Sequence, residues 1–166
     1  EGSNDPDDAI SWDKLKNKMW VHIADPSSSM ISDSEIDIVA RLRVSNLYVT
    51  ENIVSLLPSE ATDILWLGLN ETSPALSIGF KVTDTGDIED TEICFSMIKV
   101  TRLTYESAEI DLSSLELGCI PTFAKSFTQK RLVNKAVELD FPEVKISLGS
   151  DKNVKLTSLP KLNSRT

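Results

Sequence analysis

The hydrophobic period changes twice between residues 36 and 69, and this change limits the possible folds more than any other feature. Apolar residues alternate with mostly polar ones over residues 36–45, a pattern typical of a strand with one buried face. The run ILWLGL at residues 64–69 has strand length and predicts a strand covered on both faces. Between them, Thr50 is predicted to cap a short helix that Pro58 limits.

The later segments extend this pattern. Residues 75–82 and 92–105 are predicted strands, joined through the acidic, glycine-containing stretch 84–92, and the apolar phase slips between Met97 and Ile98 as at a bulge. Residues 122–139 have helical composition, and VKISL and VKLTSL predict a hairpin. We therefore expect an α+β fold, with a mainly antiparallel sheet packed against two or three helices on one face.

The first 34 residues differ from the rest of the chain because NDPDD and ADPSSS favour turns or disorder. We expect residues 1–34 to form a flexible arm and residues 35–166 to form one compact domain. Within the arm, Trp12, Met19 and Trp20 have mixed helical spacing. These aromatics either pack back on their own domain or dock on a neighbouring copy, and we expect them to mediate self-association.

The residue types needed for common enzyme sites are sparse. His22 is the single histidine and the two cysteines, Cys94 and Cys119, lie far apart, so we expect no metal site and no His-dependent catalytic triad. No glycine-rich phosphate loop is present, and we expect no cofactor. The sequence therefore predicts a non-enzymatic protein.

Charged residues are unevenly distributed along the chain. Residues 1–121 contain 8 Lys/Arg and 22 Asp/Glu, whereas residues 122–166 contain 9 and 4. The basic third is where we expect an anionic partner. Four basic residues fall on or near one side of the predicted helix: Lys125, Lys130, Arg131 and Lys135. They either bind an anionic surface or form an ordinary solvated helix face.

The stretch from Val39 to Leu69 resembles the central domain of rhabdovirus matrix proteins, and of vesiculovirus matrix proteins in particular. Matching positions in this chain are Val44, Ser45, Asn46, Asp63, Trp66 and Gly68, and Pro74 and Ile78 continue the match. About 45 residues are covered, which is a little over a quarter of the chain. Two features depart from that family: the arm is acidic, and no Pro-Pro-x-Tyr motif is present.

The resemblance implies a viral structural protein that self-associates and bridges a nucleocapsid to the inner face of an envelope. Its implied partners are further copies of itself, the viral nucleocapsid and the anionic inner leaflet of the membrane. Its implied location is the virion and the host cytoplasm, peripheral to the membrane. The acidic arm argues against membrane binding through the arm, and the missing motif suggests a different lineage, such as a plant-infecting one.

Two other functions stay open at this point. One is a viral capsid or movement-type protein that binds nucleic acid directly through the basic third. The other is a small hydrolase or transferase with an unrecognised site, which the sparse catalytic residues make the weakest of the three.

Overall fold

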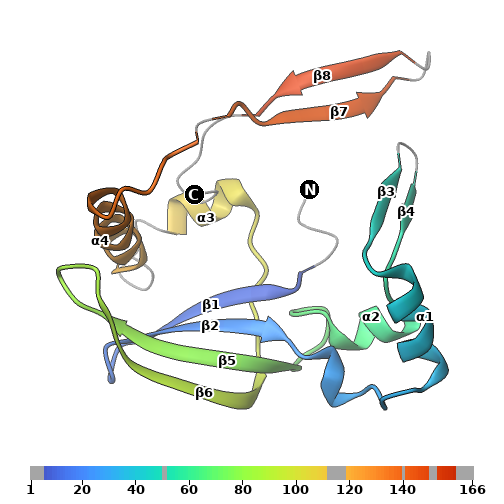
Figure 1. The fold of residues 1–166 in the computed structure, drawn as a ribbon, viewed down its shortest axis with the longest axis horizontal. Helices are drawn as coiled ribbons and strands as arrows, with labels where there is room; N and C mark the ends of the chain where they lie inside the picture. The colour runs from blue at the N-terminus through green and yellow to red at the C-terminus, as the bar shows by residue number, and fades with distance from the viewer. Residues whose placement is uncertain (1–5, 50–51, 112–118, 140, 150–152, 160–166) are drawn as a thin grey trace.

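The computed structural model describes residues 6–49, 52–111, 119–139, 141–149 and 153–159. Its largest element is a four-stranded antiparallel sheet of β1 (Asp8–Asp13), β2 (Lys18–Ala24), β5 (Ser73–Val82) and β6 (Ile88–Ile98) (Figure 1). Each strand pairs with its neighbour in the order β1-β2-β5-β6. The strands predicted near residues 75–82 and 92–105 are thus present, although β6 ends at Ile98. The pairing register shifts where Asp90 and Thr91 of β6 lie opposite Phe80 of β5, and not at Met97.

The first two strands occupy the segment where the sequence predicts an arm. Trp12 of β1 pairs with Met19 of β2, which in turn pairs with Phe80 of β5. A tight turn joins the two strands, and the Asp13 carboxylate accepts hydrogen bonds from the backbone N–H groups of Leu15 and Lys16. Residues 8–24 are therefore part of the sheet, because their apolar residues alternate with the period of a strand. A domain boundary at residue 34 stays a prediction.

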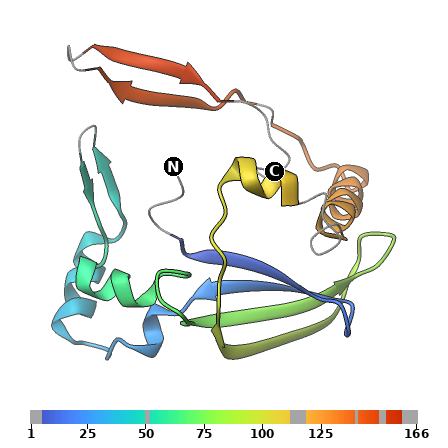
Figure 2. The same ribbon diagram turned by 180° about the vertical axis from the view of Figure 1, so that it is seen from behind.

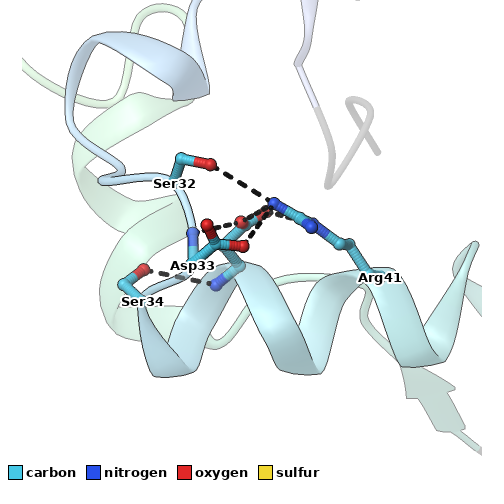
Figure 3. Close-up of polar contacts among 5 residues, drawn as sticks. Ser32, Asp33, Ser34 and Arg41 are labelled. Atoms are coloured by element: carbon cyan, nitrogen blue, oxygen red, sulfur yellow. Dashed lines mark hydrogen bonds and ion pairs between the residues drawn. The ribbon is translucent and has the colours of Figure 1, made fainter.

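A helix, α1 (Glu35–Arg43), replaces the strand predicted over residues 36–45. The Ser34 hydroxyl accepts a hydrogen bond from the Asp37 N–H at 3.4 Å and caps the helix. One turn later, the Arg41 guanidinium bonds the Asp37 carboxylate and reaches Ser32 and Asp33 (Figure 3). A cap and an i,i+4 ion pair favour the helix, so the strand prediction was wrong here.

The apolar run at residues 64–69 is not a strand either. Helix α2 (Ser59–Leu65) includes its first two residues, and the chain then turns at Gly68, whose φ is +75°. Leu65 and Leu67 are 2% and 0% exposed and form part of the core. A short apolar run does not by itself distinguish a buried helix from a buried strand.

Two small antiparallel hairpins accompany the main sheet. Strands β3 (Leu47–Val49) and β4 (Asn52–Val54) form one where a helix capped by Thr50 was expected, and Thr50 lies outside the described residues. Strands β7 (Val144–Leu148) and β8 (Val154–Ser158) form the other, as predicted. A short 3-10 helix, η1 (Pro26–Ser28), follows β2.

Two further helices complete the α+β fold, α3 (Tyr105–Asp111) and α4 (Cys119–Val133). Helix α4 confirms the first part of the helix predicted over residues 122–139, but it ends at Val133 and residues 134–139 are not helical. Both helices and the β7–β8 hairpin lie on the β1 side of the sheet in the two views (Figures 1 and 2). Within the described residues, no helix is long and apolar enough to cross a membrane.

Candidate functional site

One end of the main sheet gathers aspartates from two strands. Asp7 and Asp8 stand at the start of β1, and Asp25 directly follows β2. Because the strands are antiparallel, these positions meet: the Ala24 N–H donates to the Asp7 carbonyl at 2.8 Å, and Asp8 pairs with Ile23. We call these three aspartates the acidic end.

The three carboxylates differ in their surroundings. Asp25 is 8% exposed, and its Oδ1 accepts hydrogen bonds from the Ser27 hydroxyl at 2.5 Å and the Ser28 N–H at 3.2 Å. It therefore caps η1 and has a structural role. Asp7 and Asp8 are exposed, and no hydrogen bond or ion pair links their side chains to another residue in the described part of the chain. Only these two carboxylates at the acidic end are free to meet a ligand.

The backbone holds the acidic end in place. The Leu67 N–H donates to the Pro6 carbonyl at 2.9 Å, which fastens the start of β1 to the turn after α2. On the other side, the Asp25 N–H donates to the Pro74 carbonyl at 3.2 Å, at the start of β5. Asp5, which belongs to the same NDPDD segment, lies outside the described residues.

An open cavity of about 530 Å³ adjoins this end of the sheet. Its lining comes from η1 and the neighbouring ends of β5 and β6: Asp25, Ser27, Ser28, Pro74, Ala75, Phe95, Ser96 and Met97. Among the described residues, no group of three or more His, Cys, Asp or Glu side chains could hold a metal ion. Asp7 and Asp8 could supply at most part of such a ligand set.

At the opposite end of the sheet, acidic residues are paired with lysines. The Lys18 Nζ lies 3.4 Å from the Asp90 carboxylate and 3.1 Å from that of Glu92, and Lys81 lies 2.9 Å from Asp90. The hydrogen bond from Lys81, with the charges of Lys18 and Lys81, holds the pKa of Asp90 below its ordinary value. We call this group, together with the Asp87–Lys130 ion pair, the paired end.

Burial and ion pairing shift the pKa of Lys18 in opposite directions. Burial lowers the pKa of its ammonium group, but the hydrogen bond to Glu92 and the charge of Asp90 outweigh burial and raise the pKa. The cation is therefore kept in its charged form by its partners. The ion pairs of the paired end stabilise the sheet and occupy the carboxylates of Asp87, Asp90 and Glu92, unlike those of Asp7 and Asp8.

The residues predicted to mediate self-association lie in the sheet. Met19 is 7% exposed, and the Trp12 ring lies 4.9 Å from that of Phe123 in α4. The Trp20 indole lies against Gly79 of β5. No observation tests whether these residues contact another copy, so their role in self-association stays a prediction.

The four basic residues predicted to bind an anion have different surroundings. Lys130 is bonded to Asp87, and the Arg131 guanidinium lies 6.0 Å from the centre of the Phe127 ring. Lys125 and Lys135 are exposed. Anion binding by this group also stays a prediction.

Sequence reasoning missed Asp7 and Asp8 because NDPDD has the composition of a turn. A usable signal was present: Asp-x-Asp-Asp stands directly before residues that alternate with the period of a strand. Aspartates at the start of a strand lie at a sheet end, where side chains from neighbouring strands meet.

Comparison with known proteins identifies the family of this chain. The family model described as RNB domain matches residues 1–165. An uncharacterised ribonuclease of Synechocystis sp. is 31% identical over 166 residues, covering 94% of this chain and 25% of the relative. The chain thus spans about a quarter of the length of this relative.

Solved structures show the same fold. The RNase R of Mycoplasma genitalium in complex with ribose-methylated single-stranded RNA matches 98% of this chain and 28% of its own, with a TM-score of 0.84 and 20% identity. An active-site mutant of the Dss1 exoribonuclease from Candida glabrata matches 99% of this chain and 25% of its own, with a TM-score of 0.80 and 22% identity. Yeast Ssd1, a pseudonuclease, covers 76% of this chain and 17% of its own, with a TM-score of 0.64 and 24% identity.

These findings overturn the resemblance to rhabdovirus matrix proteins and the expectations that rested on it. The segment that carried the resemblance forms a helix where a strand was expected, and the family model covers nearly the whole chain. The relatives are cellular ribonucleases, so a virion location, nucleocapsid and membrane partners, and a non-enzymatic structural role are all wrong. The chain belongs to the RNB domain family.

Proposed function

We propose that this chain forms part of an exoribonuclease that hydrolyses single-stranded RNA, with Asp7 and Asp8 in its active site. The observation that carries the proposal is the pair of exposed, unpaired carboxylates at the acidic end, in a chain of the RNB domain family. At the opposite end of the same sheet, the carboxylates of Asp87, Asp90 and Glu92 are bonded to lysines. Free carboxylates remain able to act on a substrate.

Hydrolysis of a phosphodiester needs an activated water and stabilisation of the charge that develops on the phosphoryl oxygens. A carboxylate can accept the proton of the water or bind a divalent cation that does so. Mg²⁺ is commonly held by one or two carboxylates, with water and substrate phosphates completing its shell. The oxygens of Asp7 and Asp8 could supply these carboxylate ligands. The ion would offset the repulsion between the RNA phosphates and the two carboxylates.

The known proteins support the proposal in three ways. The Synechocystis relative is named a ribonuclease, and the M. genitalium RNase R is bound to single-stranded RNA. The Dss1 exoribonuclease is described as an active-site mutant in which an aspartate is changed to asparagine. Because this chain spans about a quarter of such proteins, the activity would belong to the polypeptide that carries it.

RNA binding without hydrolysis is the alternative, because the pseudonuclease Ssd1 has a related fold. Such a protein would keep an RNA-binding surface but would not need free carboxylates. Asp7 and Asp8 therefore favour hydrolysis, and an activity assay separates the two functions.

We also propose that helices cover one face of the main sheet, as the sequence predicts. Cross-strand pairing puts Phe95 and Leu76 on one face of the sheet, and Met97 lies two residues from Phe95 on that face. Phe95 and Met97 are 78% and 64% exposed. Burial of such side chains is favourable, so we propose that helices pack on this face.

The proposal is tested with RNA labelled at its 5′ end and incubated with the polypeptide that carries this sequence and Mg²⁺. We expect stepwise shortening of linear RNA, no cleavage of circular RNA, and loss of activity in excess EDTA. The variant with both Asp7→Asn and Asp8→Asn should be inactive. Asp84→Asn, an exposed aspartate in the turn between β5 and β6, removes one charge from the other end of the sheet and should retain full activity.

Two results would overturn the proposal. Intact RNA after prolonged incubation with a folded parent protein that binds the RNA would favour the pseudonuclease alternative. Equal hydrolysis by the parent and the double variant would show that Asp7 and Asp8 take no part in the reaction.

A further inference from the structure

A row of hydrogen-bonded side chains crosses all four strands of the main sheet. The Ser11 hydroxyl of β1 lies 2.9 Å from His22 Nε2 of β2, and His22 Nδ1 lies 2.7 Å from the Ser77 hydroxyl of β5. The Ser77 hydroxyl then lies 2.5 Å from that of Ser96 in β6. Because both ring nitrogens are bonded to side chains of adjacent strands, the imidazole is fixed across the sheet.

Trp20 lies beside this imidazole. Residues two apart in a strand point to the same face, and the rings of Trp20 and His22 are 6.4 Å apart with an angle of 7° between their planes. A Cβ at Gly79 would lie 2.8 Å from three atoms of the indole. The indole therefore lies directly on the backbone of β5, and any larger residue at position 79 would displace it.

The two parallel rings form part of the lining of an open cavity of about 390 Å³. Every lining residue belongs to one of the four strands: Ser11, Trp12, Asp13, Trp20, His22, Ser77, Cys94, Ser96 and Ile98. Burial lowers the pKa of His22 and so favours its neutral form. This side of the sheet thus combines flat aromatic surfaces with hydroxyl and carboxylate groups at their edges.

We propose that Trp20 and His22 form a shelf on which a base of single-stranded RNA stacks. Unpaired bases stack on aromatic side chains, and aromatic residues on the face of a four-stranded antiparallel sheet are one established arrangement for this purpose. Ser11 and Asp13 stand beside the shelf and provide a donor and acceptors for the edge of a base. The choice of RNA as the ligand rests on the proposed function.

The position of the shelf agrees with a strand of RNA that leads to the acidic end. His22 pairs with Ala9, and Asp7 stands two residues before Ala9 in the chain. At about 3.3 Å per residue, this separation is roughly 7 Å along the strand. One or two nucleotides of a single strand can span that length, so a base on the shelf would belong to a nucleotide near the one being cleaved.

Binding is measured in EDTA, so that the result does not depend on hydrolysis. A set of single-stranded RNAs, each with one abasic position moved along its length, is titrated against the parent protein. We expect one abasic position to weaken binding about tenfold, the usual scale for one stacked base. Trp20→Leu should weaken binding of the intact RNA by a similar factor and remove the difference between intact and abasic RNA.

Three controls separate stacking from a structural role. Trp20→Phe keeps an aromatic face and should restore most of the lost affinity. Trp66→Leu removes a tryptophan at the end of α2, away from the cavity, and should keep the parent's sensitivity to the abasic position. Thermal unfolding of each variant identifies any that fail to fold.

A second measurement requires no substitution. RNA with 4-thiouridine at single positions is irradiated with the parent protein, and the cross-linked residue is identified by mass spectrometry. A cross-link to Trp20 or His22 supports the shelf. Cross-links only elsewhere, or equal binding of intact and abasic RNA by the parent, would overturn it. These results would not bear on the proposed function, which fails only if the parent does not hydrolyse RNA.

Discussion

The two ends of the main sheet both carry aspartates, but they differ in what surrounds those aspartates. At the paired end, Lys18 and Lys81 lie within 3.4 Å of the carboxylates of Asp90 or Glu92. At the acidic end, Asp7 and Asp8 are exposed and have no side-chain partner among the described residues. The lysine partners account for a role of the paired end in stability, and the absence of such partners at Asp7 and Asp8 underlies the proposal that the acidic end acts on RNA.

The difference also explains which end a substrate could use. A carboxylate bonded to lysine must lose that partner before it can bind a cation or accept a proton, and the lost interaction opposes the reaction. Asp7 and Asp8 need no such rearrangement. Their proximity to each other keeps negative charge concentrated at one edge, where a divalent cation can offset it.

The largest predicted effect is on hydrolysis. Asp7→Asn and Asp8→Asn should each lower the rate of RNA hydrolysis at saturating RNA by about 100-fold or more, the range for loss of a positioned catalytic group. Asp87→Asn and Asp90→Asn should each change the rate by less than about twofold at 20 °C, because these carboxylates are bonded to lysines. Equal losses at both ends would remove the distinction between them.

The second predicted effect is on stability. Substitutions at the paired end should lower it, whereas substitutions of Asp7 and Asp8 should not. Lys18→Met should lower the melting temperature by roughly 5 °C, because it leaves Asp90 and Glu92 close together without the cation that lies between them. Lys16→Met, at an exposed position in the β1–β2 turn, is the matched control and should leave the melting temperature unchanged. Calorimetry on the Asp7→Asn, Asp8→Asn protein should show no loss, since repulsion between two exposed carboxylates is removed.

A third effect appears in acid. The pKa of Asp90 is held below its ordinary value of 3.8 by the hydrogen bond from Lys81 and by the charges of Lys18 and Lys81. A carboxyl with a lowered folded-state pKa contributes stability above its unfolded-state pKa and loses it as the pH falls through the folded-state value. The melting temperature of the parent should therefore decrease as the pH is lowered below about 4. The decrease should be less steep in the Asp90→Asn variant. Identical slopes for both proteins would contradict this role of Asp90.

The smallest effect concerns the ion pair between Asp87 and Lys130, whose side chains are 50% and 34% exposed. A double-mutant cycle with Asp87→Asn and Lys130→Met should give a coupling free energy below about 1 kcal/mol, since water screens such pairs. A coupling several times larger would mean that this pair, and not Lys18, secures the paired end.

Local sequence patterns predicted the elements whose signals were unambiguous. The alternation in residues 75–82, the helical composition of 122–139 and the paired runs VKISL and VKLTSL correspond to β5, α4 and the β7–β8 hairpin. The same reasoning failed at residues 36–45, where alternating apolar residues suggested a strand. There the Ser34 cap and the Asp37–Arg41 pair favour the helix, and these signals depend on spacing of three and four residues.

The candidate site could not be assembled from local patterns alone. Asp25 is 17 residues from Asp8 in the chain, and only the β1–β2 hairpin brings them to the same end of the sheet. Whether a carboxylate is free or bonded to lysine also depends on tertiary contacts, as the pairing of Lys18 with Glu92 shows. The Asp-x-Asp-Asp segment was visible in the sequence, but its role required the strand that follows it.

We propose that Asp7 and Asp8 act on bound RNA and are not needed to bind it. The most direct test measures RNA affinity and single-turnover hydrolysis in the same samples of the parent and the Asp7→Asn, Asp8→Asn protein. We predict that affinity in EDTA is unchanged or tighter, since two negative charges near the phosphates are removed, while hydrolysis with Mg²⁺ falls below detection. Hydrolysis at the parental rate by the folded double variant would contradict the account.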